Sequence, residues 1–124
     1  SQPNQIPGRR YGVCTVLIDG EVAKSCITLA ATVQRKTITT LEGLKDGEGK
    51  LTPIQQAFWD EAGLQCAFCA PGMVLTATEL LKGNAEPTDD EIRTAMAGNL
   101  CRCTGYQSIV RAVRAAARVM KQLK

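Results

Sequence analysis

The chain has 124 residues, a net charge of +3, 44% hydrophobic residues and six cysteines, but no histidine. This length suffices for one ordinary domain or two very small ones, and the composition is that of a globular protein. The lack of histidine excludes imidazole as a metal ligand and as the usual general base for a serine or cysteine nucleophile. The mild charge and the short apolar stretches predict neither nucleic acid nor a membrane as a partner.

The first eight residues, SQPNQIPG, contain no apolar stretch of the kind found in secretory signals. We therefore expect a cytoplasmic location, unless a leader has been removed or a partner carries the export signal. In a cytosolic chain, cysteines are more often metal ligands or redox thiols than structural disulfides. A functional hypothesis for this chain therefore depends on its cysteines.

The first part of the chain predicts a small β unit. A short buried strand over residues 15–18 is followed by Asp19-Gly20, a strong hairpin signal, and by a return strand over 21–25. A third strand is expected over 36–40. Residues 43–50 contain three glycines and four charged residues, which indicates a linker. We therefore expect one unit over 1–50 and a second over 51–124.

The second unit predicts four helices with their own start and stop signals. Thr52-Pro53 is a good N-cap followed by proline at the first helical position, and this helix should end at Gly63. Further helices are expected over 71–83, 88–98 and 106–122. Short loops between successive helices favour antiparallel neighbours, so an up-down-up-down four-helix bundle is expected. The expected fold class is α+β.

Four cysteines fall in two loops of this predicted bundle. Cys66 and Cys69 lie between the first and second helices, and Cys101 and Cys103 lie between the third and fourth. In such a bundle the two loops are at the same end, so the topology brings four thiols together into a tetrahedral sulfur site. The helices that begin after each pair direct their positive N-terminal ends at the site. This arrangement suits an anionic [2Fe-2S] cluster.

The spacing of the cysteines leaves other functions open. Four cysteines are also a preferred set for structural zinc, which would make the chain a zinc-stabilised interaction module without a redox role. The Cys-x-Cys pair is less usual for zinc fingers, and a disulfide within it would be strained. A third possibility is a free-standing ferredoxin-like electron carrier.

Two stretches resemble a known family. LQCAFCAPGM at 64–73 and GNLCRCTGY at 98–106 are similar to the two signatures of the small iron–sulfur subunit of molybdenum hydroxylases. That family includes xanthine dehydrogenase, aldehyde oxidoreductase and carbon monoxide dehydrogenase. The resemblance also covers CTVLIDG at 14–20 and ITTLEG at 38–43, and it extends in family order over nearly everything from residue 12 onwards. It favours iron–sulfur over zinc.

The resemblance implies an electron-transfer subunit of a molybdopterin-dependent hydroxylase or dehydrogenase complex. Electrons would leave molybdopterin in a large subunit, pass through [2Fe-2S] clusters and reach FAD in a medium subunit or another acceptor. By position, Cys66, Cys69, Cys101 and Cys103 match the ligands of the cluster in the helical domain. Gln65 and Cys103 match the residues nearest the pterin. The chain is expected to work in a hetero-oligomer and not to turn over substrate alone.

The N-terminal part departs from the family pattern. A ferredoxin-like β-grasp domain holds a plant-type cluster through C-x4-C-x2-C and a fourth cysteine. Here Cys14 and Cys26 match the third and fourth ligands, but Ile6 and Tyr11 stand where the first two should be. Cys14 and Cys26 are therefore either a remnant of the plant-type site or two small core residues. We expect a partial ferredoxin-like segment and one cluster, with a second doubtful.

Overall fold

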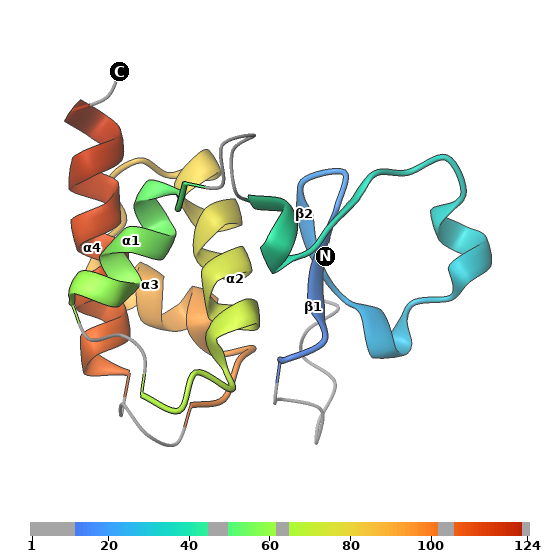
Figure 1. The fold of residues 1–124 in the computed structure, drawn as a ribbon, viewed down its shortest axis with the longest axis horizontal. Helices are drawn as coiled ribbons and strands as arrows, with labels where there is room; N and C mark the ends of the chain where they lie inside the picture. Colours follow the sequence, from blue (N-terminus) through green and yellow to red (C-terminus); the bar gives the residue numbers. More distant parts are fainter. Residues whose placement is uncertain (1–11, 45–49, 62–64, 102–105, 123–124) are drawn as a thin grey trace.

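The computed structural model describes residues 12–44, 50–61, 65–101 and 106–122. A small sheet comes first in the chain and helices follow, which confirms the predicted α+β class (Figure 1). Short 3-10 helices occupy 25–27, 30–33 and 41–44. The other elements, in chain order, are β1 (Thr15–Ile18), β2 (Glu21–Lys24), β3 (Ile38–Thr39), α1 (Pro53–Asp60), α2 (Ala70–Gly83), α3 (Asp89–Met96) and α4 (Gln107–Gln122).

The three strands form an antiparallel sheet in the order β2-β1-β3. The predicted hairpin between β1 and β2 is confirmed, and both turn residues, Asp19 and Gly20, have the positive φ that a tight hairpin turn requires. β2 ends one residue earlier than predicted. The third strand is only two residues long, because the N–H of Lys36 bonds to the carbonyl of Val33 at 3.1 Å and a 3-10 helix begins at Leu41.

The predicted helix starts are confirmed by their capping bonds. In α1 the hydroxyl of Thr52 accepts from the N–H of Gln55 at 3.2 Å, and the Gln55 side chain accepts from the N–H of Thr52 at 2.9 Å. Thr88 and Glu91 form the same reciprocal pair at α3. The helix ends differ more. α1 stops at Asp60, with 62–64 outside the described residues, and α3 stops at Met96, two residues before the predicted Gly98.

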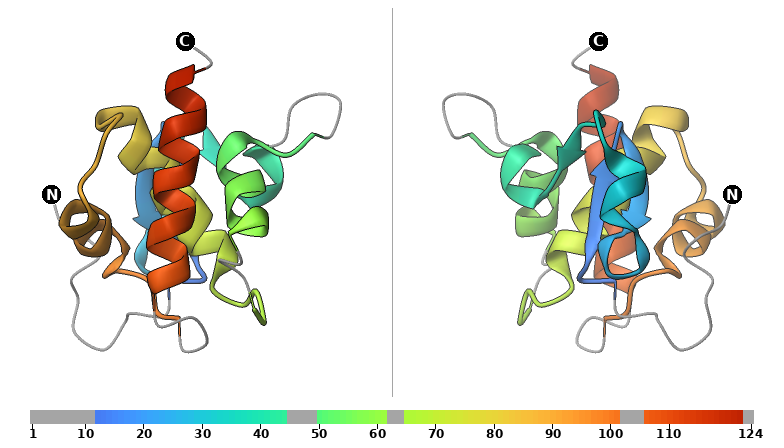
Figure 2. Two further views of the ribbon diagram at one scale, coloured as in Figure 1. Left: turned by 90° about the vertical axis from the view of Figure 1, so that its left-hand side faces the viewer. Right: turned by 90° about the vertical axis from the view of Figure 1, so that its right-hand side faces the viewer.

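The helices place the two cysteine segments together. α1 packs along α4, and α2 packs against both α3 and the sheet. Residues 65–69 and 97–101 lie at the same end of the molecule, the lower end in Figure 1 and in both views of Figure 2. In the left view of Figure 2, α3 is seen nearly end-on while α4 stands upright, so α3 runs across the bundle.

The core lies between the four helices, and a second contact joins α2 to the sheet. The largest fully buried apolar side chains are Phe58, Met73, Leu75, Ile92, Met96, Ile109 and Val113. On β1, Leu17 and Thr15 are buried on the face towards α2, while Ile38 of β3 is 51% exposed. The sheet is therefore covered by the helical part on one face.

Two glycines permit the close approach between the sheet and α2. Gly12, at the entry to β1, has a φ of +78°, and a side chain on Gly72 of α2 would clash with its carbonyl oxygen. The N–H of Val22 on β2 also donates to the carboxylate of Glu79 on α2. The division of the chain at residue 50 stays a prediction, since 45–49 lie outside the described residues. None of the described helices has both the length and the apolarity needed to cross a bilayer.

Candidate metal centre

Three of the four predicted ligands are among the described residues, and two of them touch. Cys69 is buried at the N-cap position of α2, and Cys101 is half-buried in the segment after α3. Their side chains are in hydrogen-bond contact, so the two loops meet as predicted, although α3 runs across the bundle and not antiparallel to its neighbours (Figure 2). Cys66 is exposed in the turn before α2 and lies within electrostatic reach of Cys69. Cys103 lies outside the described residues.

The turn that carries the first cysteine pair is tight. Ala67 adopts a φ of +67°, and its carbonyl accepts from the N–H of Ala70 at 3.1 Å, where α2 begins. This reversal leaves Cys69 against the helix start, close to backbone N–H groups that have no partner within the helix. Gln65 is exposed directly before the turn, where a partner molecule can reach its amide.

A tyrosine hydroxyl holds the segment that carries Cys101. The N–H of Cys101 donates to the hydroxyl of Tyr106 at 3.1 Å, and that hydroxyl donates to the carbonyl of Asn99 at 2.9 Å. Tyr106 adopts a φ of +71°, just before α4 begins. We call Asn99, Cys101 and Tyr106 the tyrosine clamp. Sequence reasoning did not assign this role, although all three residues stand in the second cysteine motif.

The thiol of Cys69 holds its proton in the absence of metal. Burial, the hydrogen bond with Cys101 and the nearby charges of Cys101 and Cys66 raise the pKa of Cys69 from 9.0 to about 12. A thiolate there is therefore favourable only when a cation balances its charge. Metal binding at this site would release protons and gain in affinity as the pH rises.

The chemistry of the described donors suits a metal centre of sulfur ligands. Cys69 and Cys101 come from two different loops, and Cys66 lies within electrostatic reach of Cys69. Four thiolates can hold either a single zinc ion or the two iron atoms of a [2Fe-2S] cluster. The donor set alone therefore fits both kinds of site.

The second cysteine pair lies in the sheet. The sulfurs of Cys14 and Cys26 are 3.3 Å apart, with Cys14 half-buried and Cys26 exposed. The interpretation of both as core residues is therefore wrong. A plant-type cluster does not fit this pair either, because this chain supplies only two of the four thiols at the required spacing. Ile6 and Tyr11 lie outside the described residues.

A buried lysine lies close to this pair. Lys24 is only 3% exposed, and its ammonium donates to the hydroxyl of Thr15 at 2.8 Å and lies 3.5 Å from Oδ1 of Asn99. Burial lowers the pKa of Lys24, against the opposing charges of the two cysteines. Burial also raises the pKa of Cys14, but hydrogen bonds with Cys26 and the charge of Lys24 outweigh it, so that pKa is lowered overall.

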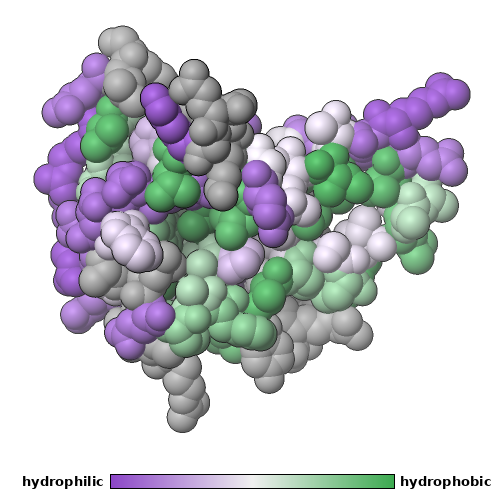
Figure 3. All heavy atoms as spheres, in the orientation of Figure 1, coloured by the Kyte–Doolittle hydropathy of each residue, from purple (hydrophilic) through white to green (hydrophobic). Residues whose placement is uncertain are grey.

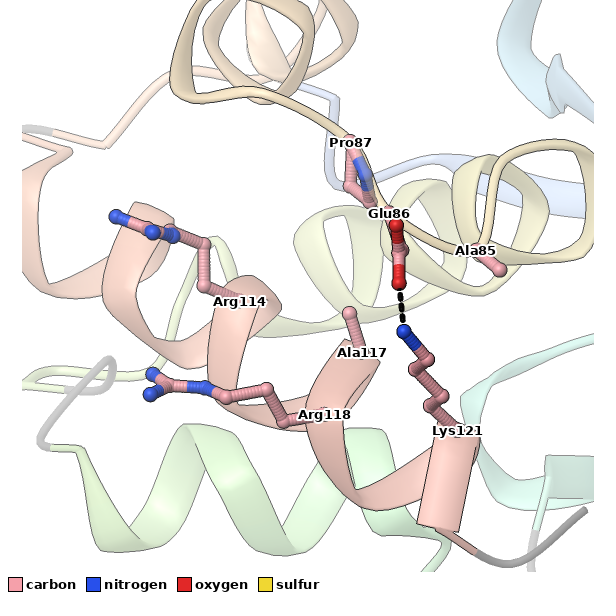
Figure 4. A pocket seen from close by; sticks show the side chains of 7 residues that line it. All are labelled: Ala85, Glu86, Pro87, Arg114, Ala117, Arg118 and Lys121. Atoms are coloured by element: carbon pink, nitrogen blue, oxygen red, sulfur yellow. Dashed lines mark hydrogen bonds and ion pairs between the residues drawn. The ribbon is translucent and has the colours of Figure 1, made fainter.

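A pocket of about 250 Å³ lies elsewhere, between α4 and the segment after α2 (Figure 4). It is lined by Arg114, Arg118 and Lys121 of α4 and by Glu86, which pairs with Lys121 across the opening. Arg114 pairs with Asp89 at 3.2 Å. These residues belong to the hydrophilic side of the molecule, at the left in Figure 3 where Figure 1 places α4. The pocket contains none of the cysteines and adds no group to the metal centre.

Known proteins are similar to this chain in both sequence and structure. Residues 40–114 match a family described as [2Fe-2S] binding domain. The chain is 52% identical over 102 residues to the nicotine 6-hydroxylase small subunit of Paenarthrobacter nicotinovorans, covering 82% of this chain and 61% of that subunit. It is 51% identical over 104 residues to the xanthine dehydrogenase iron-sulfur-binding subunit of Escherichia coli O157:H7, covering 82% of this chain and 65% of that subunit.

A solved structure extends the likeness to three dimensions. The crystal structure of quinoline 2-oxidoreductase from Pseudomonas putida 86 matches with a TM-score of 0.85 and 44% sequence identity. The match covers 93% of this chain and 72% of that chain. The chain thus spans less than two thirds of the length of the two curated relatives, but nearly all of it is shared with the solved structure.

Proposed function

Because the chain belongs to the small iron–sulfur subunits of the molybdenum hydroxylase family, as its two cysteine motifs predict, we propose that it is an electron-transfer subunit of such a complex. Cys66, Cys69, Cys101 and Cys103 hold one [2Fe-2S] cluster in this proposal. The observation that carries it is the contact between Cys69 and Cys101, which come from two loops that meet at one end of the helices. The zinc-stabilised module is not favoured by the family match.

The bound cluster supplies one-electron transfer, and the residues of the chain hold and shape its site. Cys69 and Cys101 provide thiolates from the two converging loops. The tyrosine clamp fixes the backbone of Cys101, which limits the positions that its sulfur can take. The start of α2 directs its positive end at Cys69, where it stabilises negative charge.

The surface around the metal centre supports docking to a partner. Phe68 is 66% exposed between the first two cysteines, and Leu100 is 45% exposed beside Cys101. Together with Gln65 they form what we call the cysteine-end surface. Exposed aromatic and aliphatic side chains next to polar groups are typical of protein interfaces. In the proposed complex this surface contacts a large molybdopterin-binding subunit, with Gln65 and Cys103 nearest the pterin.

The proposal assigns the other functions to partner chains. A medium subunit binds FAD and receives the electrons, and substrate oxidation occurs at the molybdenum site of the large subunit. The chain alone is not expected to oxidise substrate. The proposed hetero-oligomer is cytoplasmic. One cluster per chain is expected, because the positions of Ile6 and Tyr11 provide no thiolate for a second.

Metal analysis of the anaerobically purified chain tests this function. We expect two iron and two acid-labile sulfide per chain and an S = 1/2 EPR signal after reduction. Cys101→Ser should remove or strongly change that signal, whereas Cys26→Ser, at an exposed cysteine of the sheet, should leave it intact. Stoichiometric zinc with negligible iron in protein that has not been reconstituted would refute the proposal.

A further inference from the structure

The hairpin holds the sulfurs of Cys14 and Cys26 in contact. Cys14 directly precedes β1, and Cys26 lies in the 3-10 helix that follows β2. The register pairs Thr15 with Lys24, and the N–H of Ser25 donates to the carbonyl of Cys14 at 3.0 Å. These backbone bonds hold the two residues side by side, and their sulfurs lie 3.3 Å apart. The strand pairing therefore brings the two cysteines within reach of each other.

The chemistry of this contact differs from that of the metal centre. A disulfide bond is about 2.05 Å long, so a shift of roughly 1.3 Å in the side chains would join the two sulfurs. Cys26 is exposed, so a small molecule in solution can reach its sulfur. The ammonium of Lys24 lies in the same region and interacts electrostatically with both cysteines. An exposed thiol in contact with a half-buried one is the arrangement that intramolecular thiol–disulfide exchange requires.

We propose that Cys14 and Cys26 form a reversible thiol–disulfide pair that closes the β1–β2 hairpin covalently, with a low-molecular-weight disulfide as the oxidant. This site is distinct from the four cysteines of the helical part. It also differs from a plant-type cluster, which needs two further thiolates that this chain does not place at the required spacing.

The reaction proceeds by two thiol–disulfide exchanges. The exposed Cys26 loses its proton to solvent, and its thiolate attacks one sulfur of the oxidant. A mixed disulfide forms and one small thiolate leaves. Cys14 then loses its proton, and its thiolate attacks the sulfur of Cys26. The Cys14–Cys26 bond forms and the second small thiolate leaves. The chain loses two electrons and two protons, and the oxidant is reduced to two thiols.

The closed hairpin carries residues that reach the metal centre. Lys24 precedes Cys26 by two positions, and its ammonium lies 3.5 Å from Asn99, a member of the tyrosine clamp. Thr15, next to Cys14, donates to the same oxygen of Asn99 at 3.3 Å. Oxidation of the pair therefore occurs in a segment that is packed directly against the loop of Cys101.

The experiment uses the full chain with its cluster, kept anaerobic and treated with excess oxidised glutathione. N-ethylmaleimide then blocks the remaining thiols, and peptide mass spectrometry maps them. We expect loss of both alkylation sites, at Cys14 and Cys26, with a cross-linked peptide pair joining them and an unchanged iron content. Dithiothreitol should restore both sites.

Two variants identify the order of the steps. Cys14→Ser removes the resolving thiol, so a glutathione adduct should accumulate on Cys26. Cys26→Ser removes the exposed thiol, so Cys14 should stay open to alkylation and no internal cross-link should appear. Both variants keep all four cysteines of the helical part, so their cluster spectra report on folding.

Three results would overturn the proposal. One is full alkylation of both cysteines in the wild-type chain after oxidant treatment. Another is a disulfide between two copies of the chain in place of the internal one. The third is four iron per chain with Cys14 and Cys26 protected, which would show a second cluster. None of these results would remove the cluster of the helical part, so the proposed electron-transfer function is tested separately.

Discussion

The ammonium group of Lys24 lies 3.5 Å from the side-chain oxygen of Asn99, although the two residues are 75 positions apart in the chain. Both side chains are buried, Lys24 on the edge strand β2 and Asn99 in the segment before Cys101. The amide of Asn99 also donates to the hydroxyl of Thr76 on α2 at 2.9 Å. Asn99 thus connects the sheet, α2 and the loop that carries Cys101.

Asn99→Ala should destabilise the folded chain by about 2–4 kcal/mol, because it leaves the buried ammonium of Lys24 without one of its acceptors. Asn99→Asp keeps the acceptor and should cost clearly less. Denaturant unfolding of the cluster-loaded chain gives both free energies. Equal losses for the two variants would show that the contact with Lys24 does not contribute.

The stability of the chain should depend on pH through Lys24. Its folded pKa lies below the unfolded value of 10.5, so the unfolded chain binds this proton more tightly. The unfolding free energy then rises with pH through the folded pKa and up to 10.5. Cys14, whose pKa is also lowered, contributes in the same direction.

Lys24→Met isolates this effect. The difference in unfolding free energy between the wild type and Lys24→Met should rise towards pH 10.5, in favour of the wild type. Lys82→Met, at an exposed lysine of α2, serves as the control and should give a flat difference. A flat difference for Lys24→Met as well would contradict the burial of a charged group.

Gly72→Ala should weaken the contact between α2 and the sheet. The added methyl group would meet the carbonyl oxygen of Gly12 and the amide of Asn99, and overpacking of this kind costs about 1–3 kcal/mol. Gly83→Ala is the matched control at the end of the same helix, where a methyl group meets no atom within 4 Å. It should be neutral or stabilise by about 0.5–1 kcal/mol. Thermal unfolding should therefore place Gly72→Ala below the wild type and Gly83→Ala at or above it.

In the metal-free chain, Cys69 should react with iodoacetamide far more slowly than the exposed Cys66. A pKa of about 12 instead of 9.0 lowers the thiolate fraction near pH 8 by about 1,000-fold. Raising the pH towards 12 should restore the rate, because the thiol then ionises. Mass spectrometry of timed samples follows each site. Denatured chain is the control, in which both sites should react alike.

Phe68→Ser should weaken binding of the cluster-loaded chain to the large subunit by about 10- to 100-fold, as expected for a lost apolar burial of roughly 1.5–3 kcal/mol. Val119→Ser, at an exposed apolar residue of α4, is the control and should leave the affinity unchanged. The visible spectrum of the cluster should be the same in both. If the two variants bind alike, the cysteine-end surface is not the docking site.

The amino-acid sequence alone determined the local features of this protein. The starts of α1 and α3 were predicted because Thr52 and Thr88 make their capping bonds within three residues. The turn at Asp19-Gly20 was predicted because this dipeptide favours the positive φ of a tight hairpin turn. The meeting of Cys69 with Cys101 followed from the order of the helices and the short loops between them. Each of these rests on hydrogen bonds or connections between near neighbours in the chain.

Only the tertiary structure decided that the side chains of Lys24 and Asn99 are buried next to each other. Lysine is rarely buried, so nothing in the sequence indicated that Lys24, which pairs with the buried Thr15 of β1, would point inwards. Its burial depends on α2 covering the sheet, which the close approach of Gly12 and Gly72 allows. The partners of Lys24 come from distant parts of the chain, and packing selects them because a buried charge must find an acceptor.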